Sequence, residues 1–319
     1  MDSEKIASSA KSVVISMNPN SGAKSQKALV EQLRERLLAM GYQALVLTDI
    51  SEVQTCVAEQ LGRDELRVVV AAGGDGTVSL LANVLPSGTP IAILPLGTEN
   101  LLAKYLGQVA DPQRVADLID AGTTVRLDAG RANGKLFLVM ASCGFDADVV
   151  SRLHADRKGH IRHWSYARPI LGAIGEYQYP LIRLWVDDRL QPIEGRWAFI
   201  FNVPRYAMNL PIVTDADSMD GLLDLCTFRG GNLWRGLFYL GAVLTGQHRG
   251  WNESQLHRFQ RLRIEAGQTK GNAEGVSVER VPYQLDGDPG GVLPLEIQVQ
   301  PKFLRVVVSK GWIDKNAVL

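Results

Sequence analysis

The stretch that decides the fold reads LRVVVAAGGDGTVSLLANVL, residues 66–85. Its first seven residues, 66–72, are apolar apart from Arg67, which is typical of a buried strand. The polar turn GGDGT follows at 73–77, and helical periodicity then continues to residue 85. A buried strand that passes through a glycine-rich turn into a helix indicates part of a βαβ unit, and therefore a parallel sheet.

The same alternation extends to both sides of this stretch. Further strands are predicted at 12–17, 43–47 and 90–94, and further helices at 25–40 and 51–61. Gly97 and Thr98 are predicted to lead into another helix, which ends at residue 106. Ser51 is the predicted N-cap of the second helix, and Gly41 closes the first. Strands that alternate with helices favour a parallel sheet covered by helices on both faces.

After about residue 123 the pattern changes to short strands joined by turns, which predicts an antiparallel arrangement. We expect strands at 125–132, 135–142, 181–187, 197–202, 223–228, 262–265, 277–285 and 295–299, a turn at 286–291, and two helices near 146–155 and 233–245. The predicted fold is α/β: a Rossmann-like parallel-sheet domain over residues 1–124 and a mainly antiparallel β-sandwich domain over 125–300. Residues 301–319 are predicted to return to the first domain.

Composition excludes several classes of protein. The 319 residues carry 34 Lys and Arg against 34 Asp and Glu, and a zero net charge argues against a nucleic-acid binder held by phosphate contacts. The three cysteines are odd in number and widely spaced, as in a reducing compartment. No segment has the length and apolarity of a membrane span, and the first residues lack the apolar core of a secretory signal. We therefore expect a cytoplasmic protein, for which contact with a membrane surface and a homodimer both remain open.

The turn at 73–77 has the features of a phosphate-binding loop. Its glycines permit close approach of the backbone to a ligand, and the N–H groups at the start of a helix favour an anion. Asp75 would repel phosphate unless a cation lies between them, which points to Mg²⁺ bridging a nucleotide phosphate. The alternative is an ordinary tight turn with an aspartate cap. Two more polar turns, at 18–22 and 95–100, also end strands, so all three are expected at one edge of the sheet.

Two common phosphate motifs are absent. The sequence contains no GxxxxGK[ST], which excludes a P-loop protein, and no GxGxxG, which argues against the usual dinucleotide-binding fold. The turns that are present, NPNSG at 18–22, GGDGT at 73–77 and PLGTEN at 95–100, resemble in this order the lipid kinases that include bacterial diacylglycerol kinases, sphingosine kinases and ceramide kinases. GFDA, DGLLD and LDGD, beginning at residues 144, 220 and 285, extend the resemblance over most of the chain.

This resemblance implies an α/β nucleotide domain, a β-sandwich, and transfer of a phosphoryl group from ATP with Mg²⁺ to a lipid hydroxyl at a membrane surface. The residues it assigns to the nucleotide are Asn18, Pro19, Asn20, Ser21, Gly22, Thr48, Gly73, Gly74, Asp75, Gly76, Thr77, Val78, Ser79 and Thr98. Asp75 and Asp128 are the implied Mg²⁺ ligands, directly or through water. A second, structural cation site is implied at Asp217, Asp220 and Leu222, where a solvated acidic loop is the equal alternative.

The acceptor hydroxyl needs a base within hydrogen-bond reach. The resemblance assigns this role to the pair Asp286 and Asp288, without deciding between them; an ordinary Asp-Gly hairpin is the structural alternative. Two positions depart from the family pattern. Asp288 stands where the family usually has Glu, and Leu101 stands where bacterial diacylglycerol kinases have an Asp that joins the Mg²⁺ network.

Two other functions remain open from the sequence. An NAD kinase shares the GGDGT turn and the two-domain plan, but the segments at 95–100, 220–224 and 285–288 fit it less well. A nucleotide- or lipid-binding regulator that has lost catalysis would account for the changes at Leu101 and Asp288. The lipid itself cannot be named, because the apolar lining of an acyl-chain pocket looks like ordinary core.

Overall fold

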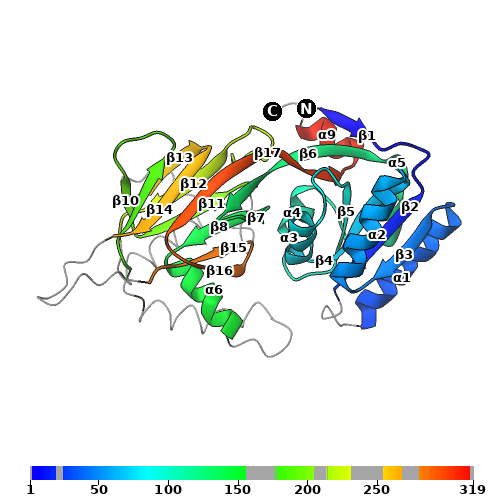
Figure 1. Cartoon of the computed structure of the whole chain (residues 1–319), viewed down its shortest axis with the longest axis horizontal. Helices are drawn as coiled ribbons and strands as arrows, with labels where there is room; N and C mark the ends of the chain where they lie inside the picture. Colours follow the sequence, from blue (N-terminus) through cyan, green and yellow to red (C-terminus); the bar gives the residue numbers. More distant parts are fainter. Residues whose placement is uncertain are drawn as a thin grey trace, which may run out of the picture. The chain divides into compact units, whose positions relative to one another are not determined.

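The computed structural model describes residues 2–18, 24–155, 177, 179–204, 213, 215–230, 254–267 and 280–316. The chain divides into two compact units (Figure 1). Unit 1 contains Met1–Asp128 and Lys302–Leu319, and unit 2 contains Ala129–Pro301. Two long strands belong to both units: β6 (Thr123–Ala132) and β17 (Leu295–Val307).

Unit 1 is built on a parallel sheet, as predicted. Its strands lie in the order β5-β4-β2-β3 and comprise β2 (Ser12–Met17), β3 (Gln43–Leu47), β4 (Leu66–Gly73) and β5 (Ile91–Pro95). In the centre, Val70 of β4 pairs in parallel register with Ile15 and with Ala92. Val306 near the end of β17 pairs in parallel with Ile91. Every residue of β4 and β5 is buried, which explains why both strands are apolar apart from Arg67 of β4.

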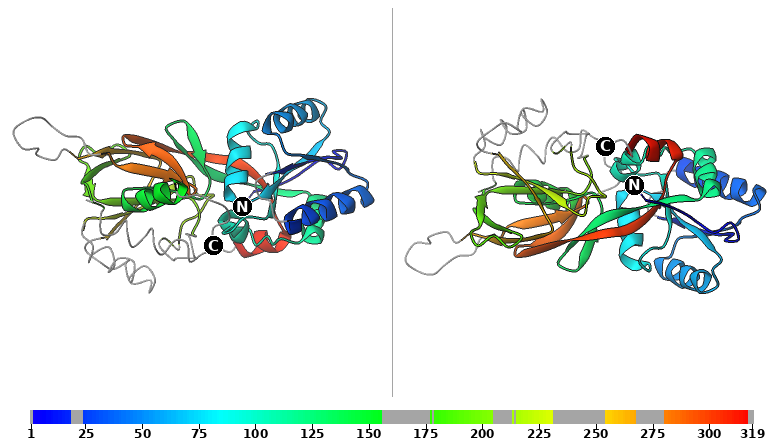
Figure 2. Two further views of the ribbon diagram at one scale, coloured as in Figure 1. Left: turned by 90° about the horizontal axis from the view of Figure 1, so that it is seen from below. Right: turned by 90° about the horizontal axis from the view of Figure 1, so that it is seen from above.

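Helices cover both faces of this sheet. The unit contains α1 (Lys24–Ala39), α2 (Ile50–Gly62), α3 (Asp75–Val84), α4 (Leu101–Tyr105), α5 (Pro112–Ala121) and α9 (Lys310–Asn316). Figure 2 shows α1 and α5 on one face and α2 on the other. Leu33 and Leu37 of α1 and Ile119 of α5 share one buried cluster with Val68 and Val70 of the sheet.

Some local predictions for unit 1 were wrong. The N-cap of α2 is Asp49, not Ser51, because the Asp49 side chain accepts hydrogen bonds from the backbone of Ser51 and Glu52. Helix α4 ends at Tyr105 rather than 106, and two elements, α5 and the short strand β1 (Ser3–Lys5), were not predicted at all. Helix α5 is nevertheless well marked, with Pro112 in its first turn and Gly122 in the left-handed conformation at its end.

Unit 2 consists of antiparallel strands, as predicted. One sheet has the order β13-β12-β11-β8-β15-β16, and a second set of paired strands has the order β10-β9-β14-β17. The bounds are β7 (Lys135–Phe137), β8 (Met140–Cys143), β9 (Ile182–Val186), β10 (Ile193–Gly195), β11 (Trp197–Phe201), β12 (Leu223–Phe228), β13 (Ser254–Phe259), β14 (Arg261–Ala266), β15 (Pro282–Leu285) and β16 (Asp288–Val292), with the helix α6 (Phe145–Ala155). Buried side chains of both sets, among them Ile200, Leu225, Leu184 and Ile264, form one sandwich core.

The structure corrects four details of unit 2. The single strand expected at 135–142 is two strands, β7 and β8, and strands β10 and β13 were not predicted. The turn expected at 286–291 is a two-residue turn followed by strand β16. Strand β17 continues to Val307 instead of stopping near 299. The helix predicted at 233–245 and the first part of the strand predicted at 277–285 lie outside the described residues.

All three cysteines are free. Cys143 and Cys226 are buried and Cys56 is half-buried, and burial raises the pKa of the Cys143 thiol to about 12. Such thiols behave as small apolar side chains, in line with the interpretation of the sequence.

Candidate active site

Two glycine-containing loops interlock at the carboxyl edge of the unit 1 sheet. The loop after β4 begins with Gly73 and Gly74, and the loop after β5 contains Leu96 and Gly97. The Leu96 amide donates a hydrogen bond to the Gly73 carbonyl at 2.9 Å. A Cβ atom added to Gly97 would lie 2.5 Å from the Gly74 Cα, and one added to Gly74 would lie 3.1 Å from the Gly97 Cα. Gly97 therefore has no room for a Cβ, and a Cβ at Gly74 would require the other loop to shift by a few tenths of an ångström.

Replacing Gly97 with alanine is expected to lower stability and nucleotide affinity together. The new methyl group would meet backbone atoms that cannot rotate away, so the two loops must separate, at a cost of about 1–3 kcal/mol. Gly62→Ala is the matched control, because a Cβ there meets nothing within 4 Å. Urea unfolding and a nucleotide-binding titration of both variants check this, and wild-type behaviour of Gly97→Ala would contradict the interlocked loops.

The second loop is held in shape by side chains from its own end and from α1. Asn100 adopts a left-handed backbone conformation, with φ 51°, and its amide group both accepts a hydrogen bond from the Gly97 N–H at 2.9 Å and donates one to the Gly97 carbonyl at 2.8 Å. Gln26 of α1 donates to the Leu96 carbonyl at 2.7 Å. These contacts leave Thr98 exposed at the edge of the sheet.

Asp75 joins the two loops. Its Oδ2 accepts a hydrogen bond from the Leu101 amide at 2.8 Å and its Oδ1 accepts one from the Leu102 amide at 3.0 Å, so the carboxylate caps the start of α4. Burial raises the pKa of the Asp75 carboxyl, and the two amides and the charge of Lys104 oppose that rise. Asp75 therefore does act as a helix cap, which was the alternative interpretation of this turn. The helix that it caps is α4, which follows the neighbouring loop, and not α3. Leu101, the departure from the family pattern, contacts Asp75 through its backbone.

The other predicted nucleotide residues differ in exposure. Asn18, Thr48 and Gly76 are exposed at or near this edge, whereas the side chains of Thr77, Val78 and Ser79 are buried on α3. Amides of α3 are already engaged, since those of Thr77 and Val78 donate to the Gly74 carbonyl at 2.9 and 3.3 Å. Nucleotide contact through all of these residues stays a prediction. Pro19, Asn20, Ser21 and Gly22 lie outside the described residues.

Asp128, the second predicted Mg²⁺ ligand, lies on β6 and is 1% exposed. Its Oδ1 accepts a hydrogen bond from the Lys302 amide of β17 at 2.7 Å. The structure therefore gives Asp128 a strand-bridging contact inside unit 1, and its role toward a cation stays a prediction.

In unit 2, the predicted acidic pair lies on a β-hairpin. Asp286 and Gly287 both have positive φ, 51° and 86°, and connect β15 to β16 with Leu285 paired to Asp288, as in a type I′ turn. The Asp286 carboxylate accepts backbone hydrogen bonds from Leu138 and Val139 at 2.8 Å each and from Met140 at 3.1 Å. Asp286 thus anchors the turn to the segment that leads into β8.

Asp288 has a different environment. It begins β16, its side chain is 46% exposed, and its Oδ1 lies 3.1 Å from Nε2 of His154 on α6. The two aspartates are separated by one glycine, but only Asp286 is tied to three backbone amides. Sequence reasoning missed His154, because a contact between residues 134 positions apart leaves no local pattern.

The predicted second cation site is a loop with an arginine beside it. Asp217 accepts a hydrogen bond from the Met219 amide at 3.0 Å, and Asp220 accepts one from the Leu222 amide at 2.9 Å. Arg258 lies 3.6 Å from Asp220 and 3.3 Å from Asp224. Burial raises the pKa of both Asp220 and Asp224, and Arg258 opposes that rise. Within the described residues, no three His, Cys, Asp or Glu side chains are grouped as metal ligands, so this cation site stays a prediction.

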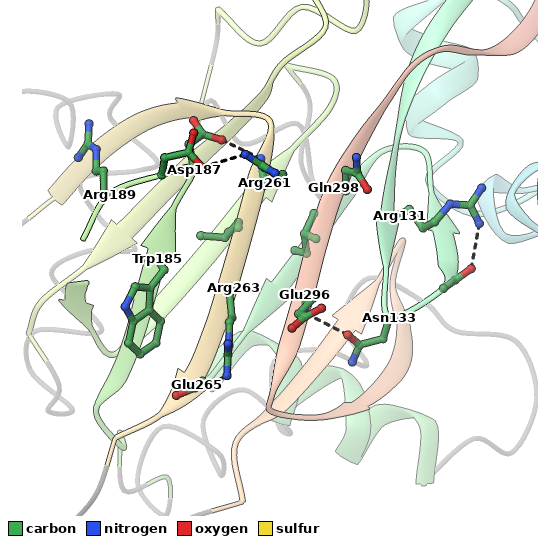
Figure 3. A pocket seen from close by; sticks show the side chains of 14 residues that line it. Arg131, Asn133, Trp185, Asp187, Arg189, Arg261, Arg263, Glu265, Glu296 and Gln298 are labelled. Atoms are coloured by element: carbon green, nitrogen blue, oxygen red, sulfur yellow. Dashed lines mark hydrogen bonds and ion pairs between the residues drawn. The ribbon is translucent and has the colours of Figure 1, made fainter. Parts of the chain in front are cut away.

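The structure also contains cavities away from these residues. A cavity of about 830 Å³ lies on unit 2 and is lined by strands β9, β14 and β17, with Trp185, Arg263 and Glu296 among its residues (Figure 3). Arg261 pairs there with Asp188 at 2.8 Å, and Arg263 pairs with Glu265. A second, of about 780 Å³, lies on unit 1 beside α5 and α9. Neither cavity is lined by any of the nucleotide-binding, metal-binding or catalytic residues that were predicted from the sequence.

Comparison with known proteins connects these features to a family. The model of the diacylglycerol kinase catalytic domain matches residues 12–132, and that of the YegS C-terminal NAD kinase beta sandwich-like domain matches residues 139–308. A diacylglycerol kinase of Mycobacterium tuberculosis (strain ATCC 25618 / H37Rv) is 30% identical over 248 residues, which cover 75% of this chain and 76% of the relative. The chain belongs to the diacylglycerol kinase family. It is therefore a lipid kinase, and the term NAD kinase enters only through the name of the C-terminal domain.

Other relatives support the same family assignment. A YegS-like lipid kinase of Pseudomonas aeruginosa (strain UCBPP-PA14) is 31% identical over 76% of this chain and 77% of the relative. The diacylglycerol kinase of Bacillus subtilis (strain 168) is 24% identical over 92% of this chain and 95% of its own length. The crystal structure of a diacylglycerol kinase from Bacillus anthracis str. Sterne matches with a TM-score of 0.66 at 17% identity, over 94% of this chain and 98% of that one, and shows that the fold is shared. In the described part of the kinase, no helix is both long and apolar enough to span a membrane.

Proposed function

We propose that the kinase transfers the γ-phosphoryl group of ATP to a hydroxyl group of a membrane lipid and depends on Mg²⁺. The observation that carries this proposal is the pair of interlocked loops at the sheet edge, joined by Asp75. Phosphoryl transfer depends mainly on positioning and on neutralising charge, and these loops supply a rigid backbone surface at the place where open α/β sheets bind ligands.

The residues at this edge fit a nucleotide with Mg²⁺. Gly76 and Gly97 are exposed at this edge and carry no side chains, so a phosphate group can approach their backbone closely. Each Asp75 oxygen accepts one described amide hydrogen bond and retains lone-pair capacity for a cation or for its waters. Mg²⁺ is usually held by one or two carboxylates together with substrate phosphates and water, so a group of three protein ligands is not required. When bound, the ion would neutralise charge on the phosphates.

We assign the acceptor base to Asp288. Both oxygens of Asp286 hold backbone amides, so moving that carboxylate would break the hairpin anchor. Asp288 is half-exposed and has one oxygen away from His154. In the transfer step, the lipid hydroxyl gives its proton to Asp288 and its oxygen forms a bond to the γ-phosphorus. The bond from that phosphorus to the β–γ bridging oxygen breaks, and ADP leaves.

Diacylglycerol is the first candidate lipid, because the relatives from M. tuberculosis and B. subtilis are named diacylglycerol kinases. A sphingoid base is the second, because Leu101 replaces the aspartate of the bacterial diacylglycerol kinase pattern. Either substrate resides in a bilayer. The corresponding location for the kinase is the cytoplasm, with peripheral binding to the membrane surface.

A labelling experiment tests this function. The purified kinase is incubated with γ-labelled ATP and Mg²⁺ in separate tubes with vesicles containing diacylglycerol, a sphingoid base, ceramide, monoacylglycerol or undecaprenol, and with NAD. Label on one lipid, lost when Mg²⁺ is chelated, is the expected result. Label on NAD alone, or ATP binding without transfer to any acceptor, would overturn the proposal, and the second outcome would favour a regulator.

Replacing Asp75 with alanine is expected to abolish label transfer while costing only about 1 kcal/mol of stability, the usual cost of a lost helix cap. Asp111→Ala is the matched control. Asp111 caps α5 of the same unit by accepting hydrogen bonds from the Gln113 and Arg114 amides at 2.9 and 3.4 Å. Both variants should unfold slightly earlier in urea, but only Asp75→Ala should lose activity and ATP binding. Equal activity in the two would show that Asp75 serves only as a cap.

A further inference from the structure

The hairpin that carries Asp288 is fixed at every residue of its turn. Gln284, 1% exposed, accepts a hydrogen bond from the Gly287 amide at 2.8 Å, and its Nε2 lies 3.0 Å from Ser142 Oγ. The Asp286 amide donates to the Met140 carbonyl at 2.9 Å, in addition to the three amides that its carboxylate holds. The turn that precedes Asp288 is therefore rigid, whereas the Asp288 side chain projects from the hairpin and is partly exposed.

His154 is the described residue whose side chain contacts the Asp288 carboxylate. It lies near the end of α6, and Figure 1 shows this helix beside β15 and β16, with which it is in contact. The start of α6 is joined to β8 and β15, because Ser142 Oγ of β8 donates to Asp146 at 2.5 Å and the Gly144 amide donates to the Pro282 carbonyl of β15 at 3.0 Å. A helix attached in this way holds His154 at a constant position relative to the hairpin.

The chemistry of the pair decides which group donates. An ionised carboxylate only accepts hydrogen bonds, so Nε2 of His154 must carry the proton that is shared with Oδ1 of Asp288. A bond from a fixed donor restricts rotation about the Asp288 side chain and leaves Oδ2 as the oxygen available to a substrate. An aspartate has one rotatable bond fewer than the usual glutamate, so it has fewer conformations in which it can reach its partner.

We propose that His154 is a positioning residue for phosphoryl transfer, which orients the Asp288 carboxylate toward the acceptor hydroxyl through an Nε2–H···Oδ1 hydrogen bond. This inference rests on the proposed role of Asp288 as the base. We expect its effect in the chemical step, since His154 contacts the proposed base.

The test compares His154→Leu with His154→Gln under steady-state conditions with diacylglycerol or whichever lipid of the panel is labelled. Leucine removes the donor, and glutamine offers a side-chain N–H in its place. We expect His154→Leu to lower kcat by about tenfold to a hundredfold, with the KM values for ATP and lipid within about twofold of wild type. His154→Gln should recover most of the lost kcat. Asp148→Asn, which removes the 2.7 Å ion pair of Asp148 with Arg152 on the same helix, is the control and should retain full activity.

The outcomes separate this inference from the proposed function. Loss of kcat in His154→Leu with an unchanged Tm and recovery in His154→Gln supports the positioning role. Equal loss in both variants, or loss that follows Tm, would assign His154 a structural role and overturn the inference. If Asp288→Asn abolishes transfer and His154→Leu does not, the base assignment stands and the inference fails. If Asp288→Asn is active, the base assignment itself fails.

Discussion

The Asp288→Asn kinase is expected to bind ATP normally and to transfer label about 10²–10⁴ times more slowly than the wild type. This range is the usual contribution of a general base, and an amide cannot accept the proton of the acceptor hydroxyl. The asparagine side chain has nearly the same shape and keeps an oxygen to accept the hydrogen bond from His154. We expect Tm to remain within about 1 °C, because exposed substitutions change stability little. Measurement of kcat, ATP affinity and Tm on one preparation checks all three expectations.

Asp286→Asn provides the contrast. Its Oδ1 and Oδ2 both accept backbone amides, so the substitution turns one acceptor into an NH₂ donor that faces an N–H group. A buried amide left without a partner costs about 1–3 kcal/mol, which urea unfolding would detect. Asparagine tolerates the positive φ at this position, so backbone strain adds little. A stable but inactive Asp286→Asn, with an active Asp288→Asn, would exchange the roles that we assign to the two residues.

The Arg67→Met kinase is expected to lose about 3–5 kcal/mol of stability, the largest loss among these predictions. Arg67 lies at the start of β4 and is only 4% exposed. Its guanidinium donates to four backbone carbonyls: those of Ile119 and Asp120 at the end of α5, and those of Ile6 and Ala7 that follow β1. Methionine can fill much of the volume, but these carbonyls lose the guanidinium donors, and only for that of Ala7 is another donor described, the Ala10 amide at 3.1 Å.

Arg67 connects β4 to the end of α5 and to the residues that follow β1, so its loss should affect the whole unit. A cation at the end of α5 also interacts favourably with the negative end of the helix dipole. Arg114→Met on the same helix is the control, because that arginine side chain is 71% exposed and pairs with Asp111 at 3.6 Å at the surface, an interaction worth about 0–1 kcal/mol. Urea unfolding of both variants measures the difference. A loss below about 1 kcal/mol for Arg67→Met would show that water or a local shift replaces the missing donors.

Local patterns predicted the parallel sheet well because three of its strands, β2, β4 and β5, are almost fully buried, so their apolar runs are nearly continuous. They failed where a short element depends on its neighbours. Helix α5 has ten residues, with an apolar stripe that includes Val115 and Ile119, and it is stabilised by packing against α1 and by the carbonyl contacts of Arg67. Strands β10 and β1 have three residues each and exist through pairing with partners elsewhere in the chain.

The sequence by itself determined the family, the two kinds of sheet, and the edge of the sheet at which the glycine loops lie. Strand periodicity and glycine spacing are local properties, and the carboxyl ends of parallel strands necessarily share an edge. Only the tertiary structure decided which groups each of the predicted acids contacts. It placed Asp75 on the amides of α4, tied Asp286 to three amides of another strand connection, and set His154 beside Asp288. These partners are distant in the chain, and long-range packing alone decides which hydrogen-bonding groups meet.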